Sequence, residues 1–307
     1  MIASSLTVGP SPRRRAHRGA GEGRAAWVLV LPDVLGLCLI YVGPILFTIY
    51  LSFFSWNGIS PQRTFVGFDN YRYIFSDPVW MRSLGVSFAY LLMYVPLVTG
   101  GALFLAVLLA QKLRGTALFR TIFFLPMAVP VVVAAIVWQF IFQPSYGFVN
   151  FLLQSVGLPA QPWLSSPQQA LVVVVLVSAW KQVGYFMIIF LAAILAVPKD
   201  YLEAASLDGA GSFRRFWSIT WPTIRPTTAF VVVMTSIIAL QDFDQIFVLT
   251  KGGPDYGTYV QVYYIYEQML RYLHMGPASA ASVVLFLIIM VLSIAQIRLL
   301  RGGRDAD

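Results

Sequence analysis

Six long apolar stretches run through this chain of 307 residues. An α-helix rises about 1.5 Å per residue, so roughly 20 consecutive apolar residues are enough to cross the hydrocarbon core of a bilayer. The stretches that reach this length cover residues 26–54, 84–110, 121–143, 169–196, 227–249 and 277–297. The sequence therefore predicts an all-α integral membrane protein with six transmembrane helices.

The composition leads to the same class of protein. Hydrophobic residues make up 58% of the chain and charged residues 11%, whereas about a quarter of the residues in a soluble domain are charged. This balance excludes a typical cytosolic enzyme, and it excludes a disordered chain, which would be poor in aliphatic and aromatic residues. One cysteine and two histidines argue against a thiolate or imidazole metal cage, so we expect no metal site.

Basic residues predict the orientation, because the cytoplasmic flanks of spanning helices are enriched in Lys and Arg. Fifteen of them lie in the N-terminal tail, in the connections after the second and fourth stretches, and in the C-terminal tail. Only five lie in the alternate connections: Arg63, Arg72, Arg82, Lys251 and Arg271. We therefore expect both termini in the cytoplasm, and we attribute the net charge of +8 to these flanks rather than to binding of nucleic acid.

The remaining segments follow from the positions of the spans. We expect a cytoplasmic basic tail at 1–25, an extracytoplasmic segment at 55–83, a core with the other five spans at 84–297, and a cytoplasmic tail at 298–307. Prolines inside the spans, Pro44, Pro96, Pro126 and Pro130, predict bent helices, since proline has no N–H to donate to the preceding turn. The carbonyls that are freed must then be satisfied by neighbouring protein.

The cytoplasmic connection 198–222 carries the most informative pattern. Helix formers at its start predict about two helical turns, and Asp208-Gly209 ends them because glycine accepts the left-handed conformation of a helix C-terminus. Ser212 is a candidate N-cap for a second helix. In that helix four side chains would share one face: Phe213, Phe216, Trp217 and Thr220.

A pair of short helices with an aromatic face outside the membrane needs a surface to pack against. Ala204 and Ala205 would let the backbone of a partner approach closely, and Glu203 offers that partner a charge. The alternative is a helical connector that lies on the bilayer surface. The residues alone leave both interpretations open.

These motifs resemble one family. Glu203-Ala204-Ala205, Asp208-Gly209-Ala210, and Ile219 with Pro222 resemble the EAA loop of ABC importer permeases, although Trp221 replaces the leucine that usually precedes the final proline. Residues 247–254 look like the LTxGGP signature of carbohydrate-type permeases, and the segments 66–71, 77–78 and 119–126 resemble other parts of the same group. The resemblance covers roughly residues 27–300 and indicates the maltose and glycerol-phosphate type of permease.

This resemblance implies a type I ABC importer permease fold in the inner or plasma membrane of a bacterial cell. In that family the loop is the coupling helix, which docks into a cleft of the ATP-hydrolysing subunit. The residues implied in coupling are Glu203, Ala204, Ala205, Asp208, Gly209, Ala210, Phe213, Ile219 and Pro222. The implied partners are a second homologous permease, ABC ATPase subunits, an extracytoplasmic solute-binding protein and a sugar or sugar derivative as substrate.

Two kinds of motif do not occur in the sequence. It contains no Gly-x-x-x-x-Gly-Lys-Ser/Thr phosphate-binding loop, so we expect the chain to bind no cofactor and to have no ATPase site of its own. ATP and Mg would be used by the partner subunit. Motifs of serine hydrolases and of metal-binding helices do not occur either, and we predict a transport subunit rather than an enzyme.

Polar residues at membrane depth are candidates for the substrate pathway. Lys181 lies near the midplane of the fourth span, where a lysine costs ~2.5–3.5 kcal/mol on insertion scales. It would donate to a polyhydroxylated substrate or form an ion pair with an acidic residue of a neighbouring helix. Other groups suited to sugars belong to Gln139, Gln143, Gln182, Tyr185 and Gln241. Asp242 lies near the outer boundary, where it would border the pathway or meet external water. Hydrogen bonding between helices is the alternative for most of them.

Two other functions stay open at this point. An ion-gradient-driven secondary transporter would show inverted repeats with broken helices and buried acidic residues for coupling, and the sequence shows neither clearly. A membrane scaffold without a substrate would have an all-apolar interior, against which Lys181 and the glutamines argue. We therefore predict a permease subunit that forms half of a transmembrane pathway for a sugar and works by alternating access.

Overall fold

The computed structural model describes residues 20–111 and 115–301. Most of the two predicted tails, 1–25 and 298–307, lies outside the described residues, and so do the basic residues of the connection at 112–114. The chain divides into two units, Met1–Phe47 and Thr48–Asp307.

The N-terminal apolar stretch is helical and contains a π-helical turn just before Pro44. Helix α1 (Ala20–Leu37) continues through the π-helical turn η1 (Cys38–Val42) into α2 (Gly43–Leu51). The N–H of Gly43 donates to the carbonyl of Cys38, five residues back. Pro44 cannot donate and its ring would crowd an ordinary α-turn, so a wider turn accommodates it. Almost every described side chain between Trp27 and Val42 is exposed, as expected of a helix whose solvent is lipid.

The segment predicted to be extracytoplasmic begins with a short antiparallel hairpin. Strand β1 (Phe54–Ser55) pairs with β2 (Thr64–Phe65), with Phe54 opposite Phe65. Helix α3 (Asp69–Ser76) follows. Its Asn70 amide donates to the carbonyls of Ser52 and Phe54, at 2.8 and 3.0 Å, and so ties the helix to the start of the hairpin.

Helix α4 (Pro78–Ala110) begins before the apolar stretch that predicted a span at 84–110. Asp77 explains this start, because its Oδ1 accepts the N–H of Val79 at 2.8 Å and a proline occupies the first helical position. One buried stripe recurs at every fourth residue and consists of Tyr90, Tyr94, Val98, Ala102 and Ala106. Helix α4 packs mainly against α8 and also against α11, and the fourfold spacing keeps the stripe on one face of the helix.

The third apolar stretch is broken into two helices. Helix α5 (Thr116–Ala128) and helix α6 (Val131–Ile141) are bent by 98° at their junction. Val129 adopts an extended conformation, with φ −72° and ψ 131°, which is the region that a residue before proline prefers. The predicted bend at Pro130 is therefore confirmed, whereas Pro96 stays within the continuous helix α4.

The rest of the chain is also helical. Its elements are α7 (Phe148–Ser155), η2 (Trp163–Ser165), α8 (Pro167–Leu195), α9 (Lys199–Leu207), α10 (Ser212–Arg215), η3 (Phe216–Thr220), α11 (Trp221–Gln241), α12 (Asp244–Leu249), α13 (Gln261–Tyr266), η4 (Glu267–Arg271) and α14 (Met275–Arg301). The stretch that predicted one span at 227–249 differs most, because helix runs from Ser212 to Gln241 and stops at Asp242 before α12.

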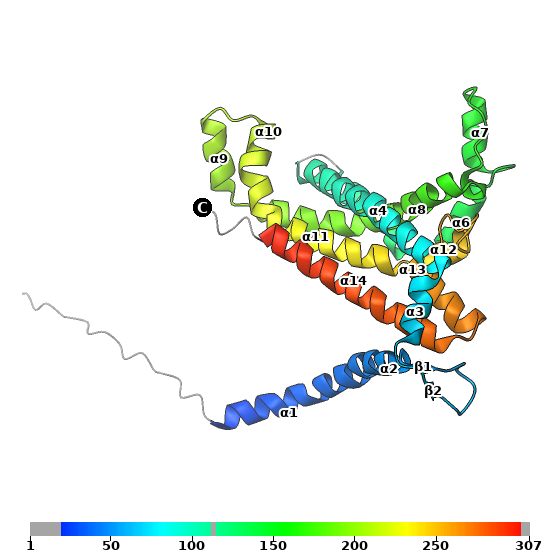
Figure 1. The fold of residues 1–307 in the computed structure, drawn as a ribbon. Helices are drawn as coiled ribbons and strands as arrows, with labels where there is room; N and C mark the ends of the chain where they lie inside the picture. Colours follow the sequence, from blue (N-terminus) through cyan, green and yellow to red (C-terminus); the bar gives the residue numbers. More distant parts are fainter. Residues whose placement is uncertain (1–19, 112–114, 302–307) are drawn as a thin grey trace, which may run out of the picture. The chain divides into compact units, whose positions relative to one another are not determined.

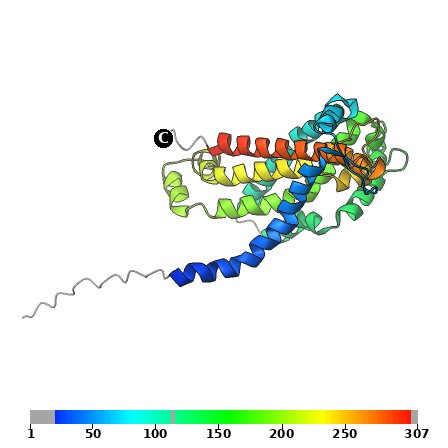
Figure 2. The same cartoon turned by 60° about the horizontal axis from the view of Figure 1, so that its bottom comes forward.

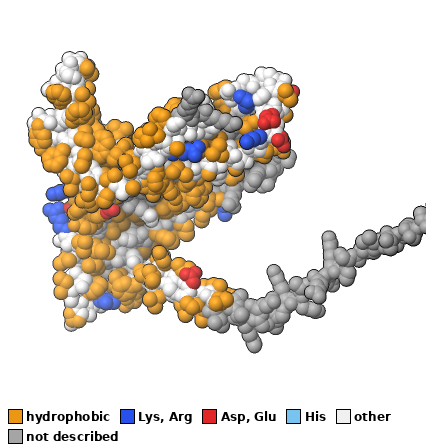
Figure 3. Space-filling model, turned by 180° about the vertical axis from the view of Figure 1, so that it is seen from behind, with side chains coloured by type: hydrophobic (Ala, Val, Ile, Leu, Met, Phe, Trp, Pro, Cys, Tyr) orange, Lys and Arg blue, Asp and Glu red, His pale blue; other side chains and the backbone are white. Residues whose placement is uncertain are grey.

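In the second unit, α4, α8, α11 and α14 pack side by side into a bundle (Figures 1 and 2). Helices α9 and α10 lie at one end of it, and α6, α12 and α13 lie at the other (Figure 1). Hydrophobic side chains cover much of the face shown in Figure 3, where charged side chains are sparse. Five described helices are long and apolar enough to cross a membrane, and the bent pair α5–α6 makes a sixth span if it crosses as one. The predicted all-α membrane class is confirmed.

Candidate functional site

The loop between α8 and α11 contains a well-defined helix end. Gly209 has φ +76°, and its N–H donates to the carbonyl of Ser206 at 3.1 Å. The N–H of Ala210 reaches back to the carbonyl of Ala205 at 2.9 Å. Together these two bonds form a Schellman motif, which glycine favours at the left-handed position. The predicted end of the helix at Asp208-Gly209 is confirmed.

The start of the second helix differs from the prediction. Gly211 is the N-cap residue, and the Ser212 side chain makes no capping bond because Ser212 is already helical. The hydroxyl of Ser212 instead accepts from the Arg215 guanidinium at 3.4 Å. The same guanidinium donates to Ser206 Oγ at 2.6 Å. Arg215 therefore links α10 to α9 and helps to set the angle of the loop.

The predicted single face of the second helix is only partly present. Phe213 is 78% exposed and Trp217 is exposed, but Thr220 is buried. The cause is the π-helical turn η3, which precedes Pro222 and changes the rotation per residue. Ring centroids of Phe213 and Trp217 lie 6.2 Å apart, so an exposed aromatic pair remains on the outer surface of the loop.

A groove of about 440 Å³ lies between α9 and the start of α11. It is lined by Tyr201, Ala204, Ala205, Asp208, Ser218, Ile219, Pro222 and Thr223. Five of the residues predicted for coupling are therefore brought together here. Glu203, Gly209 and Phe213 are exposed beside it, and the side chain of Leu207 is 90% exposed. Small residues in the groove and apolar side chains around it suit an incoming protein helix or loop.

Lys181 is 6% exposed and makes no ion pair among the described residues. Its ammonium donates to the carbonyls of Pro126 at 3.3 Å, Met127 at 3.2 Å and Val129 at 2.5 Å. These carbonyls lie at the end of α5, where the break interrupts the helical hydrogen bonds. The Pro126 carbonyl also accepts the N–H of Val129 at 3.3 Å. The predicted alternative of an ion pair is therefore wrong. The lysine supplies the donors, and its positive charge faces the negative end of the helix dipole.

Asp242 forms the centre of a polar cluster where α11 ends. Its Oδ2 accepts hydrogen bonds from the hydroxyl of Tyr90 and from Ser178 Oγ, the latter at 3.0 Å. Ser178 Oγ also lies 2.6 Å from Gln245 Oε1. Side chains from α4 and α8 and the N-terminal turn of α12 thus meet at the break between α11 and α12. Asp244, two residues on, is exposed.

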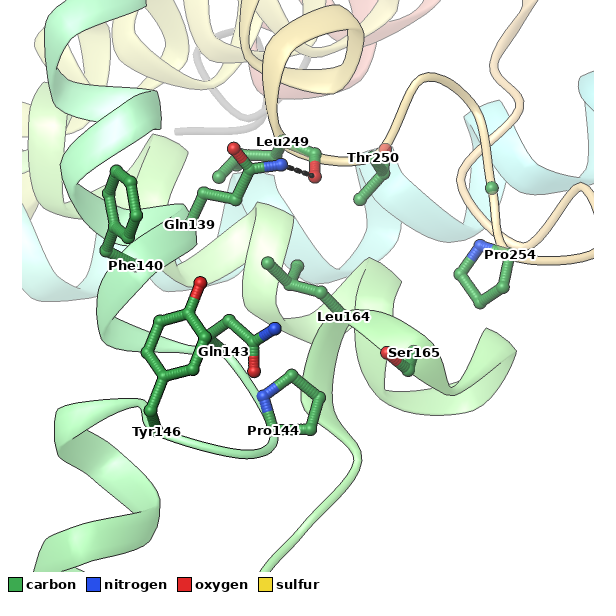
Figure 4. A pocket seen from close by; sticks show the side chains of 11 residues that line it. Gln139, Phe140, Gln143, Pro144, Tyr146, Leu164, Ser165, Leu249, Thr250 and Pro254 are labelled. Carbon is green, nitrogen blue, oxygen red and sulfur yellow. Dashed lines mark hydrogen bonds between the residues drawn. The ribbon is translucent and has the colours of Figure 1, made fainter.

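The structure does not gather the predicted pathway residues into one cluster. In the part of the chain that the structure describes, no hydrogen bond joins any two of Lys181, Gln182, Tyr185, Gln139, Gln241 and Asp242. Gln182 and Tyr185 are half-buried and Gln241 is exposed. Gln139 Nε2 donates to the carbonyl of Leu249 at 3.3 Å and lines a cavity (Figure 4).

That cavity has a volume of about 550 Å³. Its lining consists of Gln139, Phe140, Gln143, Pro144, Tyr146, Leu164, Ser165, Leu249, Thr250, Gly253 and Pro254. It brings the end of α6 together with η2 and with the turn after α12, which contains part of the LTxGGP-like segment.

Three residues of these sites were not predicted from the sequence: Tyr90, Ser178 and Tyr146. Tyr90 and Ser178 sit in long apolar helices. A serine hydroxyl there ordinarily bonds within its own helix, and neither residue gives a signal of a distant partner. Tyr146 stands in the irregular connection after α6, and only folding brings η2 and the turn after α12 to the same cavity.

Residues 101–302 match the family described as "Binding-protein-dependent transport system inner membrane component". The chain belongs to this family. The permease is 34% identical to the probable ABC transporter permease protein YurN of Bacillus subtilis, over 91% of this chain and 97% of the relative. It is 35% identical to the sn-glycerol-3-phosphate transport system permease protein UgpA of Brucella abortus, over 89% of this chain and 93% of the relative.

The fold of the permease is also found in a solved structure. One chain of the bacterial alginate ABC transporter in complex with alginate pentasaccharide-bound periplasmic protein matches with a TM-score of 0.82. The match covers 95% of this chain and 99% of that chain at 22% identity, a level that establishes the shared fold alone. The predicted ABC importer permease subunit is confirmed, and the family name favours it over an ion-driven transporter or a scaffold.

Proposed function

We propose that this permease is one of two homologous membrane subunits of an ATP-driven importer for a sugar or sugar derivative. A separate pair of ABC ATPase subunits would hydrolyse ATP with Mg, and an extracytoplasmic solute-binding protein would deliver the substrate. The N- and C-termini and the 198–222 loop would face the cytoplasm, as the distribution of basic residues predicts.

The exposed loop at one end of the bundle carries this proposal. The groove, the aromatic pair and the exposed Leu207 leave apolar surface uncovered at this end of the bundle. Such a surface marks a protein contact. The helix that begins at Ser212 continues to Gln241. Movement of the loop by an ATPase subunit would therefore be transmitted along α11 to the polar cluster at Asp242.

The substrate pathway is proposed for the six polar residues predicted from the sequence. Gln182, Tyr185 and Gln241 present polar groups at the surface of an otherwise apolar bundle. The second permease would cover them and leave a polar path between the subunits. Asp242 and Lys181 would border the path while holding the breaks after α11 and α5.

An affinity purification tests the assembly. The permease is isolated from detergent-solubilised membranes and the co-purifying proteins are identified by mass spectrometry. We expect a second six-span subunit and an ATPase with a phosphate-binding loop, both lost or strongly reduced in Glu203→Arg. Gln154→Arg, an exposed position on α7, is the matched control and should retain both. Recovery of the permease alone, or as a homo-oligomer, would contradict the proposal.

A second pair of variants tests the shape of the loop rather than its charge. Gly209 has open space around its Cβ position but a φ of +76°. Valine is strained in this conformation, whereas asparagine accepts it. We expect Gly209→Val to uncouple ATP hydrolysis from uptake and Gly209→Asn to stay close to the wild type. Equal activity of the two variants would show that the Schellman turn has no part in coupling.

A further inference from the structure

The cavity at the end of the bundle opposite to the loop has the size of a small-molecule site. Its volume of about 550 Å³ lies within the ~300–1,000 Å³ that is usual for ligand pockets. Figure 4 shows Gln139, Gln143 and Tyr146 on one side of it, with Ser165 and Pro254 on the other.

Hydrogen bonds orient the two side-chain amides that line the cavity, so that one leaves its oxygen free and the other its nitrogen. Gln139 donates to the Leu249 carbonyl, so its nitrogen is engaged and its oxygen stays free to accept. Gln143 Oε1 accepts from the N–H of Ser145 at 2.7 Å and from Ser145 Oγ at 2.9 Å, so its nitrogen stays free to donate. A backbone N–H can only donate and a carbonyl can only accept, and these bonds therefore fix both orientations. A sugar hydroxyl, which donates and accepts, satisfies both amides.

Aromatic rings supply the second element of sugar recognition. Tyr146 is 67% exposed and Phe140 is also exposed. Several aromatic residues nearby form ring pairs with one another. Among the described residues, neither Tyr146 nor Phe140 is a member of such a pair. The negative face of such a ring attracts groups with partial positive charge, and the C–H groups on one side of a sugar ring are of this kind.

The lining of the cavity contains no Asp, Glu, Lys, Arg or His. Lys251 and Asp255 flank the turn, but neither is a lining residue, and the Asp255 carboxylate is paired with Arg82 at 3.2 Å. A phosphate or carboxylate placed here would find no opposite charge among the lining residues. The lining therefore favours a ligand without charge.

We propose that this cavity is a binding site for a neutral saccharide at the outer mouth of the permease. Gln139 and Gln143 would bond its hydroxyls, and Tyr146 with Phe140 would pack against its ring. The proposal rests on the proposed function and narrows its substrate class to saccharides without phosphate or carboxylate groups.

Ligand-observed NMR tests the site directly. The purified transporter complex, in lipid nanodiscs and without the binding protein, is mixed with neutral di- and trisaccharides, and separately with sn-glycerol 3-phosphate and trigalacturonate. We expect saturation transfer to ring protons of at least one neutral saccharide and none to the charged probes. Gln143→Leu and Tyr146→Ala should weaken this binding about tenfold or more. Gln154→Leu, the same exchange on the exposed surface of α7 outside the cavity, should bind as the wild type does.

Three results would overturn the cavity proposal. They are saturation transfer to the charged probes alone, no saturation transfer to any neutral saccharide, or cavity variants that bind the saccharide as well as Gln154→Leu does. A loss of binding-protein association in the cavity variants, with the saccharide signal intact, would make the cavity a protein contact instead. The proposed function fails by a different measurement. If the complex binds a neutral saccharide but shows no ATP-dependent uptake in proteoliposomes, the binding site stands and the proposed ATP-driven import is rejected.

Discussion

The ammonium of Lys181 donates to three carbonyls where the break between α5 and α6 interrupts the helical hydrogen bonds. A proline-broken span needs a donor from elsewhere in the protein, since lipid offers none. Lysine suits this place because one ammonium carries three N–H donors and a charge that the helix terminus favours. The residue is thus explained by the geometry of its neighbour.

We expect Lys181→Met to destabilise the permease by about 1–3 kcal/mol, the usual cost of leaving buried acceptors unpaired. The measurement is the free energy of unfolding in mixed micelles titrated with SDS. Lys251→Met, at an exposed lysine, is the control and should change little. An unaltered stability of Lys181→Met together with a loss of uptake would instead assign the lysine to the substrate.

At the scale of the elements, the contact between α5 and α8 depends on one glycine. A Cβ built on Gly184 would lie 1.8 Å from the carbonyl oxygen of Phe123, so the two backbones touch where α8 crosses α5. This closeness also allows Lys181, one turn earlier on α8, to reach the end of α5. Two contacts with α8 therefore hold the broken span: the close backbone approach at Gly184 and the hydrogen bonds from the Lys181 ammonium.

We expect Gly184→Ala to lower the free energy of unfolding by about 1–3 kcal/mol, because backbone atoms must move apart to admit the methyl group. The matched control is Gly100→Ala in α4, whose Cβ position has nothing within 4 Å and whose helix should gain up to ~1 kcal/mol. The measurement is the melting temperature of each variant in detergent. Equal melting temperatures would contradict the close approach.

At the scale of the whole molecule, the two ends of the second unit are expected to face opposite sides of the membrane. The distribution of basic residues predicts that the loop around Leu207 lies in the cytoplasm and the hairpin around Ile59 outside. Both side chains are well exposed, at 90% and 76%, so both can be labelled without unfolding the protein.

Ile59→Cys and Leu207→Cys, each in a Cys38→Ser background, test this orientation. We expect a membrane-impermeant maleimide to label Ile59→Cys in intact spheroplasts and to label Leu207→Cys only after permeabilisation. The Cys38→Ser parent is the background control, because Cys38 is the single cysteine of the chain. The reverse pattern would invert the topology and remove the loop from the reach of a cytoplasmic ATPase.

The presence of several membrane-spanning helices was predictable from the sequence because a bilayer imposes a minimum length and a polarity limit on each span. Their bounds were not, since α4 starts at Pro78 and the helix from Ser212 stops at Gln241. The end of α9 was also predictable, since the left-handed position at Gly209 is a local property of the chain. The bend at Pro130 follows from local sterics as well. These features depend on residues that are neighbours in sequence.

Contacts between distant residues decided the rest. The bonds of Lys181 to the end of α5, of Asp242 to Tyr90, and of Gln139 to the Leu249 carbonyl join segments far apart in the chain, and no periodicity encodes them. The cavity that includes Tyr146 exists only after α6, η2 and the turn after α12 have packed together. The sequence by itself thus determined a membrane-spanning helical permease. The tertiary structure decided which polar side chains hold broken helices together and which remain free for a ligand.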